Sequence, residues 1–194
     1  HRDLHSFPTR RSSDLRQSAL ISGSVDIINR PALKGIDRLK KVKGVNILAI
    51  PSNLAFTHPM RMDVPPFDNN DLRMALKLST PRQEFMDKVL FGYGVMGNDQ
   101  PLGPQFPSYD ANLKPEYDLD KAKYHLKKAG LEGVKIDLSA SNTSYGGALD
   151  AAQLFQSHWG KIGVNLNIIR EPQDGYWTNV WNGSSAERRV GQVC

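Results

Sequence analysis

A glycine-rich segment is the first feature of this chain whose residue types could do chemistry. Residues 92–97 read Gly-Tyr-Gly-Val-Met-Gly, which matches the G-x-G-x-x-G spacing that cradles the pyrophosphate of a dinucleotide. That fingerprint needs a strand before it and a helix after it, whereas a helical pattern precedes this segment and a proline-containing stretch follows it. We therefore interpret residues 92–97 as a glycine-rich helix exit.

Three histidines and a cluster of hydroxyl residues are the other candidates for chemistry. His58, His125 and His158 lie far apart in the sequence and lack paired ligand spacing, so we expect surface or core-edge histidines and no metal site. Residues 139–144 are rich in Ser and Thr, but they lack the G-x-S-x-G pattern of a nucleophile elbow. We therefore predict no catalytic residue, no cofactor and no enzymatic activity.

The composition excludes several classes of protein. The chain has 194 residues, 39% hydrophobic and 23% charged, with a formal net charge of +5 and a single cysteine. One cysteine excludes a disulfide scaffold, and no apolar run approaches the roughly 18 residues of a membrane-spanning helix. No basic run is interleaved with aromatic residues, so we predict no nucleic-acid partner. One or two small globular domains fit this length.

The two ends of the chain resemble translated sequencing adapters. Residues 1–15 match the translation of a common short-read library adapter, and residues 184–194 resemble the translation of its reverse complement. We expect both segments to be non-native and exclude them from fold reasoning. The exclusion removes His1-Arg2-Asp3-Leu4, which copies the start of a kinase catalytic loop, and Cys194 as a candidate nucleophile.

The first part of the remaining sequence predicts a strand, a helix and a second strand. Apolar runs at 25–28 and 45–50 favour strands, and leucine and isoleucine at three-residue spacing favour a helix over 31–42. Residues 51–67 then contain four prolines. We interpret that stretch as a crossing segment or domain boundary.

The second part predicts alternating helices and strands. Capping residues at 68–71, at Thr80-Pro81 and at Asp118 each precede an apolar helical pattern. Residues 93–117 show no clear period and are expected to form a long ordered loop or a pair of small turns. The last predicted elements are a strand at 134–138, a helix at 147–162 and a strand at 164–169, which together indicate a βαβ crossover and an α/β fold.

The order of the short motifs resembles a known family. In sequence they follow the pattern of the extracytoplasmic solute-binding proteins, family 5, of peptide and nickel ABC transporters. The motifs are Gly23-Ser24-Val25-Asp26-Ile27, Pro65-Pro66-Phe67-Asp68, Asp71-Leu72-Arg73-Met74-Ala75-Leu76, Arg82-Gln83, Val89-Leu90-Phe91-Gly92, Tyr117-Asp118-Leu119-Asp120-Lys121-Ala122, Lys127-Lys128-Ala129-Gly130, Ile162-Gly163-Val164 and Asp174-Gly175-Tyr176-Trp177.

The resemblance implies a fragment of a two-lobed, periplasmic-binding-protein-like (type II) fold, with mixed sheets and flanking helices. Residues 16–60 would be the end of the first lobe and the hinge crossing, and residues 61–183 the truncated first part of the second large lobe. Beside the cleft, the crossing segment would offer Phe56, Thr57, His58 and Met60 to a ligand. The alternative that these residues only pack the hinge stays open.

The resemblance also implies a function without catalysis. The parent protein would be the substrate-binding component of an ABC transporter, a monomer that captures peptides or similar small solutes and delivers them to ABC permease subunits. It would work in the periplasm or on the outer face of the cytoplasmic membrane, with its signal sequence missing from this fragment. An α/β enzyme domain of unknown reaction and a solute-sensing receptor of the same fold remain as alternatives.

Overall fold

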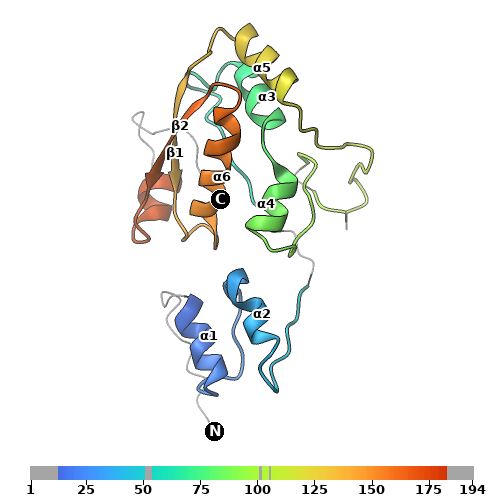
Figure 1. The fold of residues 1–194 in the computed structure, drawn as a ribbon, viewed down its shortest axis with the longest axis vertical. Coiled ribbons are helices and arrows are strands. Elements are labelled where there is room, and N and C mark those ends of the chain that lie inside the picture. The colour runs from blue at the N-terminus through green and yellow to red at the C-terminus, as the bar shows by residue number, and fades with distance from the viewer. Residues whose placement is uncertain (1–12, 51–53, 101, 105, 183–194) are drawn as a thin grey trace. The chain divides into compact units, whose positions relative to one another are not determined.

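The computed structural model describes residues 13–50, 54–100, 102–104 and 106–182. The chain divides into two compact units, residues 1–51 and residues 52–194. Figure 1 shows short helices in the smaller unit, and helices with a small sheet in the larger one. Among the described helices, none is long and apolar enough to cross a membrane.

The smaller unit is built from short helical pieces. Helix α1 covers Ser13–Ile21, the 3₁₀ turn η1 covers Leu33–Gly35, and α2 covers Ile36–Leu39. The predicted helix over 31–42 is therefore confirmed only in its middle. Ile36 and Leu39 are buried, because the apolar three-residue spacing brings both side chains onto one face.

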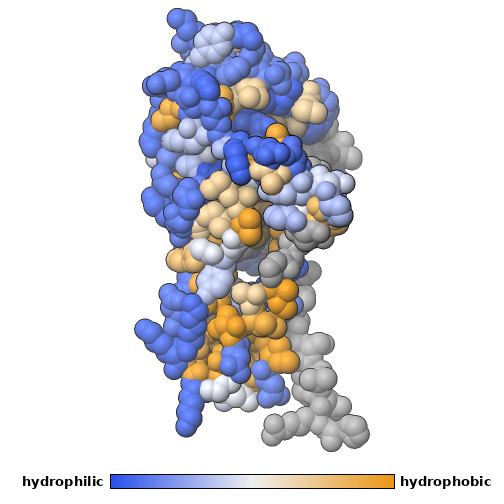
Figure 2. Space-filling model, turned by 90° about the vertical axis from the view of Figure 1, so that its right-hand side faces the viewer, coloured by the Kyte–Doolittle hydropathy of each residue, from blue (hydrophilic) through white to orange (hydrophobic). Residues whose placement is uncertain are grey.

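The two strands predicted in this unit, at 25–28 and 45–50, are wrong for the described structure. Neither stretch forms a strand, and their large side chains lie in solvent, with Ile27 86%, Leu48 81% and Ile50 69% exposed. Figure 2 shows apolar side chains gathered over the surface of the smaller unit. An apolar run becomes a strand only when another strand satisfies its backbone groups.

The larger unit begins with helices whose ends follow local chemistry. Helix α3 covers Asn70–Leu78, and the Asn69 side chain accepts hydrogen bonds from two backbone amides of its first turn, as expected of an N-cap. Helix α4 covers Arg82–Lys88 without a side-chain cap. The predicted Thr80 cap is wrong, because its hydroxyl donates back to the Leu76 carbonyl at 2.7 Å.

Helix α5 covers Leu119–Lys128 and packs against α3. The Asp118 carboxylate accepts from two amides of the first turn, and Gly130 follows the helix with a φ of 68°, so both predicted ends are confirmed. His125 donates from Nδ1 to Asp71 of α3 at 2.7 Å. The histidine expected at the surface therefore joins the two helices.

The βαβ crossover is confirmed. Strand β1 covers Lys135–Ala140, helix α6 covers Ala148–Gly160, and strand β2 covers Asn165–Arg170. The strands pair in parallel along their whole length, and α6 packs against both of them. A π-helix, η2 (Tyr176–Trp181), follows; its Tyr176 is fully buried, and we did not predict this element from the sequence.

The N-cap of α3 is open to a direct test. Replacing Asn69 by Ala removes the acceptor for two orphan amides, so we expect a loss of about 1 kcal/mol in the free energy of unfolding, measured by urea denaturation. Asn69→Asp keeps an acceptor and should stay close to wild type. Equal losses in both variants would contradict the capping role.

Candidate functional site

The crossing segment places the four predicted ligand residues on alternating sides. Phe56, His58 and Met60 are half-buried, and Thr57 between the first two is exposed. Residues 55, 57 and 59 are exposed, so burial alternates along the segment, as in a chain whose neighbouring side chains point to opposite sides. One side of the segment therefore lies against the rest of the larger unit, and the side that carries Thr57 faces away from it.

The buried side of the segment packs into a group of aromatic rings, the aromatic cluster. The Phe56 ring lies 4.5 Å from that of Tyr145 between centroids, and the His58 ring meets Phe155 edge-on at 4.6 Å. Phe85 of α4 stacks on Phe155 of α6 at 6.2 Å with 7° between the planes. Such ring pairs contribute about 0.5–1.5 kcal/mol beyond the area they bury.

A glycine allows α4 to approach α6 this closely. Gly147 precedes α6 with a φ of 96°, and a Cβ built on it would lie 2.9 Å from a methyl group of Val89, just after α4. A side chain would be strained in this backbone conformation and would collide with Val89. Glycine at this position therefore allows the start of α6 to lie close to Val89, at the end of α4.

His58 is neutral within the aromatic cluster. Its Nε2 lies 3.4 Å from the Tyr145 hydroxyl, and burial, with a smaller effect from the positive charge of Arg82, lowers its pKa to about 4. Desolvation penalises the charged imidazolium. At neutral pH the uncharged ring therefore packs as an aromatic group with one polar contact.

A second histidine holds α4, α6 and the start of α5 together through polar contacts. His158 is 4% exposed, with Nδ1 2.6 Å from the Tyr117 hydroxyl and Nε2 3.2 Å from the Glu84 carboxylate. Burial and the nearby charge of Lys161 lower the pKa of His158. A carboxylate only accepts, so the neutral ring donates from Nε2 to Glu84 and accepts at Nδ1 from Tyr117. We call this arrangement the Glu84–His158–Tyr117 clasp.

The hydroxyl residues at the end of β1 and in the loop that follows it bond to the protein itself. Ser139 of β1 donates to the Glu171 carboxylate at 2.7 Å, and Thr143 donates to the Gln173 carbonyl at 3.5 Å. Ser144 donates to the Ser141 carbonyl within the loop at 2.7 Å. The first two contacts link β1 and its loop to the residues just after β2.

The glycine-rich segment is a helix exit, as predicted. Gly92 follows α4 with a φ of 77°, and no strand precedes the segment. Asp99, which follows it, pairs with Arg82 of α4 at 2.9 Å and with Lys77 of α3 at 3.3 Å. Two ion pairs of Asp99 thus link the end of this stretch to α3 and α4.

The histidines do not form a metal site. Across the residues that the structure describes, no group of three or more His, Cys, Asp or Glu side chains could hold a metal ion.

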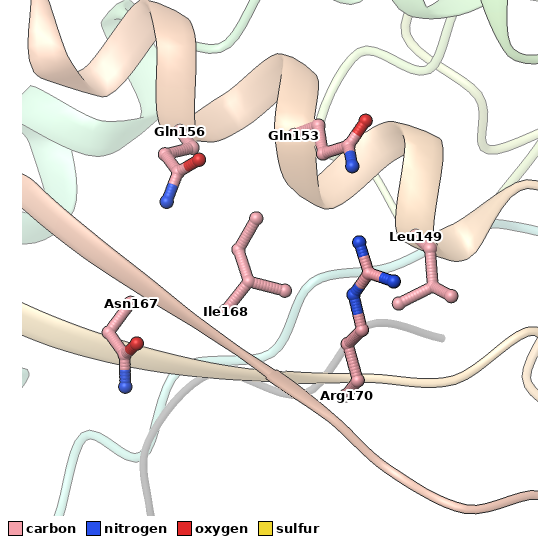
Figure 3. Close-up of a pocket in the computed structure, with 6 residues that line it drawn as sticks. All are labelled: Leu149, Gln153, Gln156, Asn167, Ile168 and Arg170. Atoms are coloured by element: carbon pink, nitrogen blue, oxygen red, sulfur yellow. The ribbon is translucent and has the colours of Figure 1, made fainter.

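A pocket of about 260 Å³ opens between α6 and β2, away from the four predicted residues. Figure 3 shows the Arg170 guanidinium directed toward α6, and Gln156 donates to the Leu166 carbonyl at 2.7 Å. The volume lies just below the range of about 300–1,000 Å³ usual for small-molecule sites. Its lining residues are Leu149, Gln153, Gln156, Asn167, Ile168 and Arg170.

Comparison with known proteins decides the family. The profile described as "Bacterial extracellular solute-binding proteins, family 5 Middle" matches residues 7–187. The chain belongs to this family. The resemblance carried by the short motifs is confirmed. The matched range enters both terminal segments that resemble adapters, whose origin stays a prediction.

The relatives of this family-5 chain are binding proteins. It is 30% identical over 171 residues to di/tripeptide-binding protein 1 of Pseudomonas aeruginosa (strain UCBPP-PA14) and 27% identical over 168 residues to the dipeptide-binding protein of Escherichia coli (strain K12). Each match covers 84% of this chain and 31% of the relative. The chain therefore spans about a third of the length of these proteins.

A solved structure supports the fold class. The periplasmic binding protein DppA of Helicobacter pylori, in complex with a peptide, superposes on this family-5 chain with a TM-score of 0.76 and 25% identity. The match covers 94% of this chain and 35% of that one. The prediction of part of a two-lobed type II periplasmic-binding-protein fold is confirmed.

Sequence reasoning missed the partners of the histidines. The sequence predicted the helices that carry Phe85 and Phe155, but no local signal linked either ring to His58. The Tyr117–His158 contact joins residues 41 positions apart. No periodicity or cap encodes such a contact, because it depends on how the helices pack.

The clasp predicts a cost for losing His158. His158→Phe keeps a ring but leaves Tyr117 and Glu84 without this partner, so we expect about 1–3 kcal/mol less stability toward urea. Tyr117→Phe removes one contact and should cost about 1 kcal/mol. The double variant should lose less than the sum of the two single losses. Strict additivity would show that the two side chains do not act together.

Proposed function

We propose that the complete protein is the substrate-binding component of an ABC transporter that captures peptides or similar small solutes. Support comes from the family match over residues 7–187 and from relatives named as di/tripeptide-binding and dipeptide-binding proteins. These relatives are named as binding proteins. The proposed protein therefore binds and releases its solute without chemical change.

The proposed ligand site lies where the crossing segment meets the end of β1. In α/β folds, ligands bind outside the carboxyl ends of the strands. Tyr145 lies in the loop that leaves the carboxyl end of β1, and its ring contacts Phe56 while its hydroxyl contacts His58. This juxtaposition carries the proposal. Phe56, His58 and Met60 form a wall of the cleft, and exposed Thr57 offers its side chain to the ligand.

The two lobes of the proposed protein close over the solute about a hinge. Residues 16–60 contribute the end of the first lobe and the crossing, and residues 61–183 contribute the first part of the second. The partition rests on the resemblance to the family and on the four prolines of 51–67.

The proposed location rests on the family description, and the proposed partners rest on the resemblance of the motifs to ABC-transporter binding proteins. The protein works outside the cytoplasmic membrane, in the periplasm or on the outer face of that membrane, as the word extracellular in the family description suggests. It acts as a monomer and delivers the solute to ABC permease subunits.

Thr57 tests the position of the cleft. In the complete protein that contains this sequence, Thr57→Trp should weaken binding of the dipeptide Ala-Ala at least about tenfold, because the larger ring fills the space beside the crossing segment. Isothermal titration measures the affinity. Tyr124→Trp, at an exposed position of α5, is the matched control and should bind as wild type does. Unchanged affinity in Thr57→Trp would place the ligand elsewhere.

A two-lobed cleft also predicts how the 194-residue chain behaves by itself. Since a ligand enclosed by two lobes loses half its contacts when one is incomplete, we expect no Ala-Ala binding at millimolar peptide in titration calorimetry. The complete protein, measured beside it, should bind. Micromolar binding by the isolated chain would contradict the shared cleft.

A further inference from the structure

In the described structure, side-chain contacts hold the crossing segment against the rest of the larger unit. Between described residues, no backbone hydrogen bond joins residues 55–60 to another element. The contacts of Phe56 are with aromatic rings. The contact between His58 Nε2 and the Tyr145 hydroxyl is the one polar tie from residues 55–60 that the described structure contains.

His58 contacts two further elements at the same place. Its ring meets Phe155 of α6 edge-on at 4.6 Å and Phe85 of α4 at 6.1 Å, with interplanar angles of 85° and 86°. An uncharged imidazole suits such a site, since it packs as a ring and keeps one hydrogen bond. An imidazolium there would need a new acceptor for its second proton.

We propose that His58 is the positioning residue of the crossing segment: the neutral ring docks residues 55–60 against Tyr145 and Phe155, and protonation of the ring in acid releases them. The proposal rests on the proposed function, in which this segment forms a wall of the ligand cleft. Protonation of His58 therefore loosens the wall and weakens solute binding.

Among the described residues, no carboxylate is paired with His58 to balance a positive charge. From α4 comes Arg82, itself a cation, whose guanidinium pairs with Asp99. The loop after β1 contributes the hydroxyl of Tyr145, and α6 contributes the apolar ring of Phe155. A charged His58 ring therefore has a lower free energy in water than in this site.

The direction of the pH effect follows from the two states of the ring. Burial lowers the pKa of docked His58 from 6.5 to about 4. Docking of residues 55–60 has its full strength above pH 6.5 and weakens as the pH falls toward 4. The equilibrium constant for docking should fall by about tenfold per pH unit within this window, roughly 300-fold in all.

NMR on the full chain tests the proposal. The cross-relaxation peaks between the Phe56 and Tyr145 rings should weaken as the pH falls from 6.5 to 4.5, with the docked-to-undocked ratio falling about tenfold per unit, while those between Phe85 and Phe155 stay constant. His58→Phe keeps the ring and cannot be protonated, so its Phe56–Tyr145 peaks should not change over that range. His125→Gln, the matched control at a histidine away from the segment, should follow the wild-type profile.

Three results would overturn the proposal. These are Phe56–Tyr145 peaks that do not weaken with acid in the wild type, an unchanged acid loss in His58→Phe, and an NMR titration that gives His58 a pKa of 6 or above. The titration uses the wild-type chain, so it decides the matter even if His58→Phe does not fold. Ala-Ala binding by the complete protein at pH 7.5 tests the proposed function separately, because His58 is neutral there.

Discussion

The contact between α4 and α6 is the constraint on which the site depends. Phe85 and Phe155 stack with nearly parallel planes, and Gly147 lets the backbone before α6 approach Val89. Together these features bring one end of the βαβ crossover against a helix that lies far earlier in the chain. The stacked rings are also the surface on which His58 rests, so the position of the crossing segment follows from this helix pair.

Two histidines in this region, the buried His158 and the half-buried His58, have different roles. His158 uses both ring nitrogens, and its partners come from α4 and from the start of α5. His58 uses one ring nitrogen and otherwise packs as an aromatic ring. A buried polar group stabilises a fold when its hydrogen bonds are made and destabilises it when they are not. The clasp thus holds α4, α6 and the start of α5 in one arrangement, whereas docking of the crossing segment by His58 depends on the charge of the ring.

The smaller unit shows what a strand requires beyond its own sequence. Residues 25–28 and 45–50 have the apolar composition of strands, yet in the described structure neither pairs, and Ile27 and Leu48 lie in solvent. The chain spans about a third of the length of its relatives. Sheet formation is non-local, so an apolar run without a partner strand does not form a strand even though its composition favours one.

The sequence by itself determined the elements whose signals are local. Asn69 and Asp118 mark helix starts through their own side chains, and the alternation in β1 and β2, with α6 between them, indicated the crossover. A cap or a period involves residues a few positions apart, so it can be read without knowing the fold. Motif order likewise sufficed to identify the family.

Only the tertiary structure decided which residues meet across the larger unit. It turned the Thr80 hydroxyl back to the preceding helix, placed Phe56 and His58 against Tyr145, and joined Tyr117 to His158. Apart from the Thr80 contact, these contacts link positions tens of residues apart, and their free energy depends on burial and on partners brought by other elements. No local pattern carries that information, because packing chooses among partners that the sequence leaves equally available.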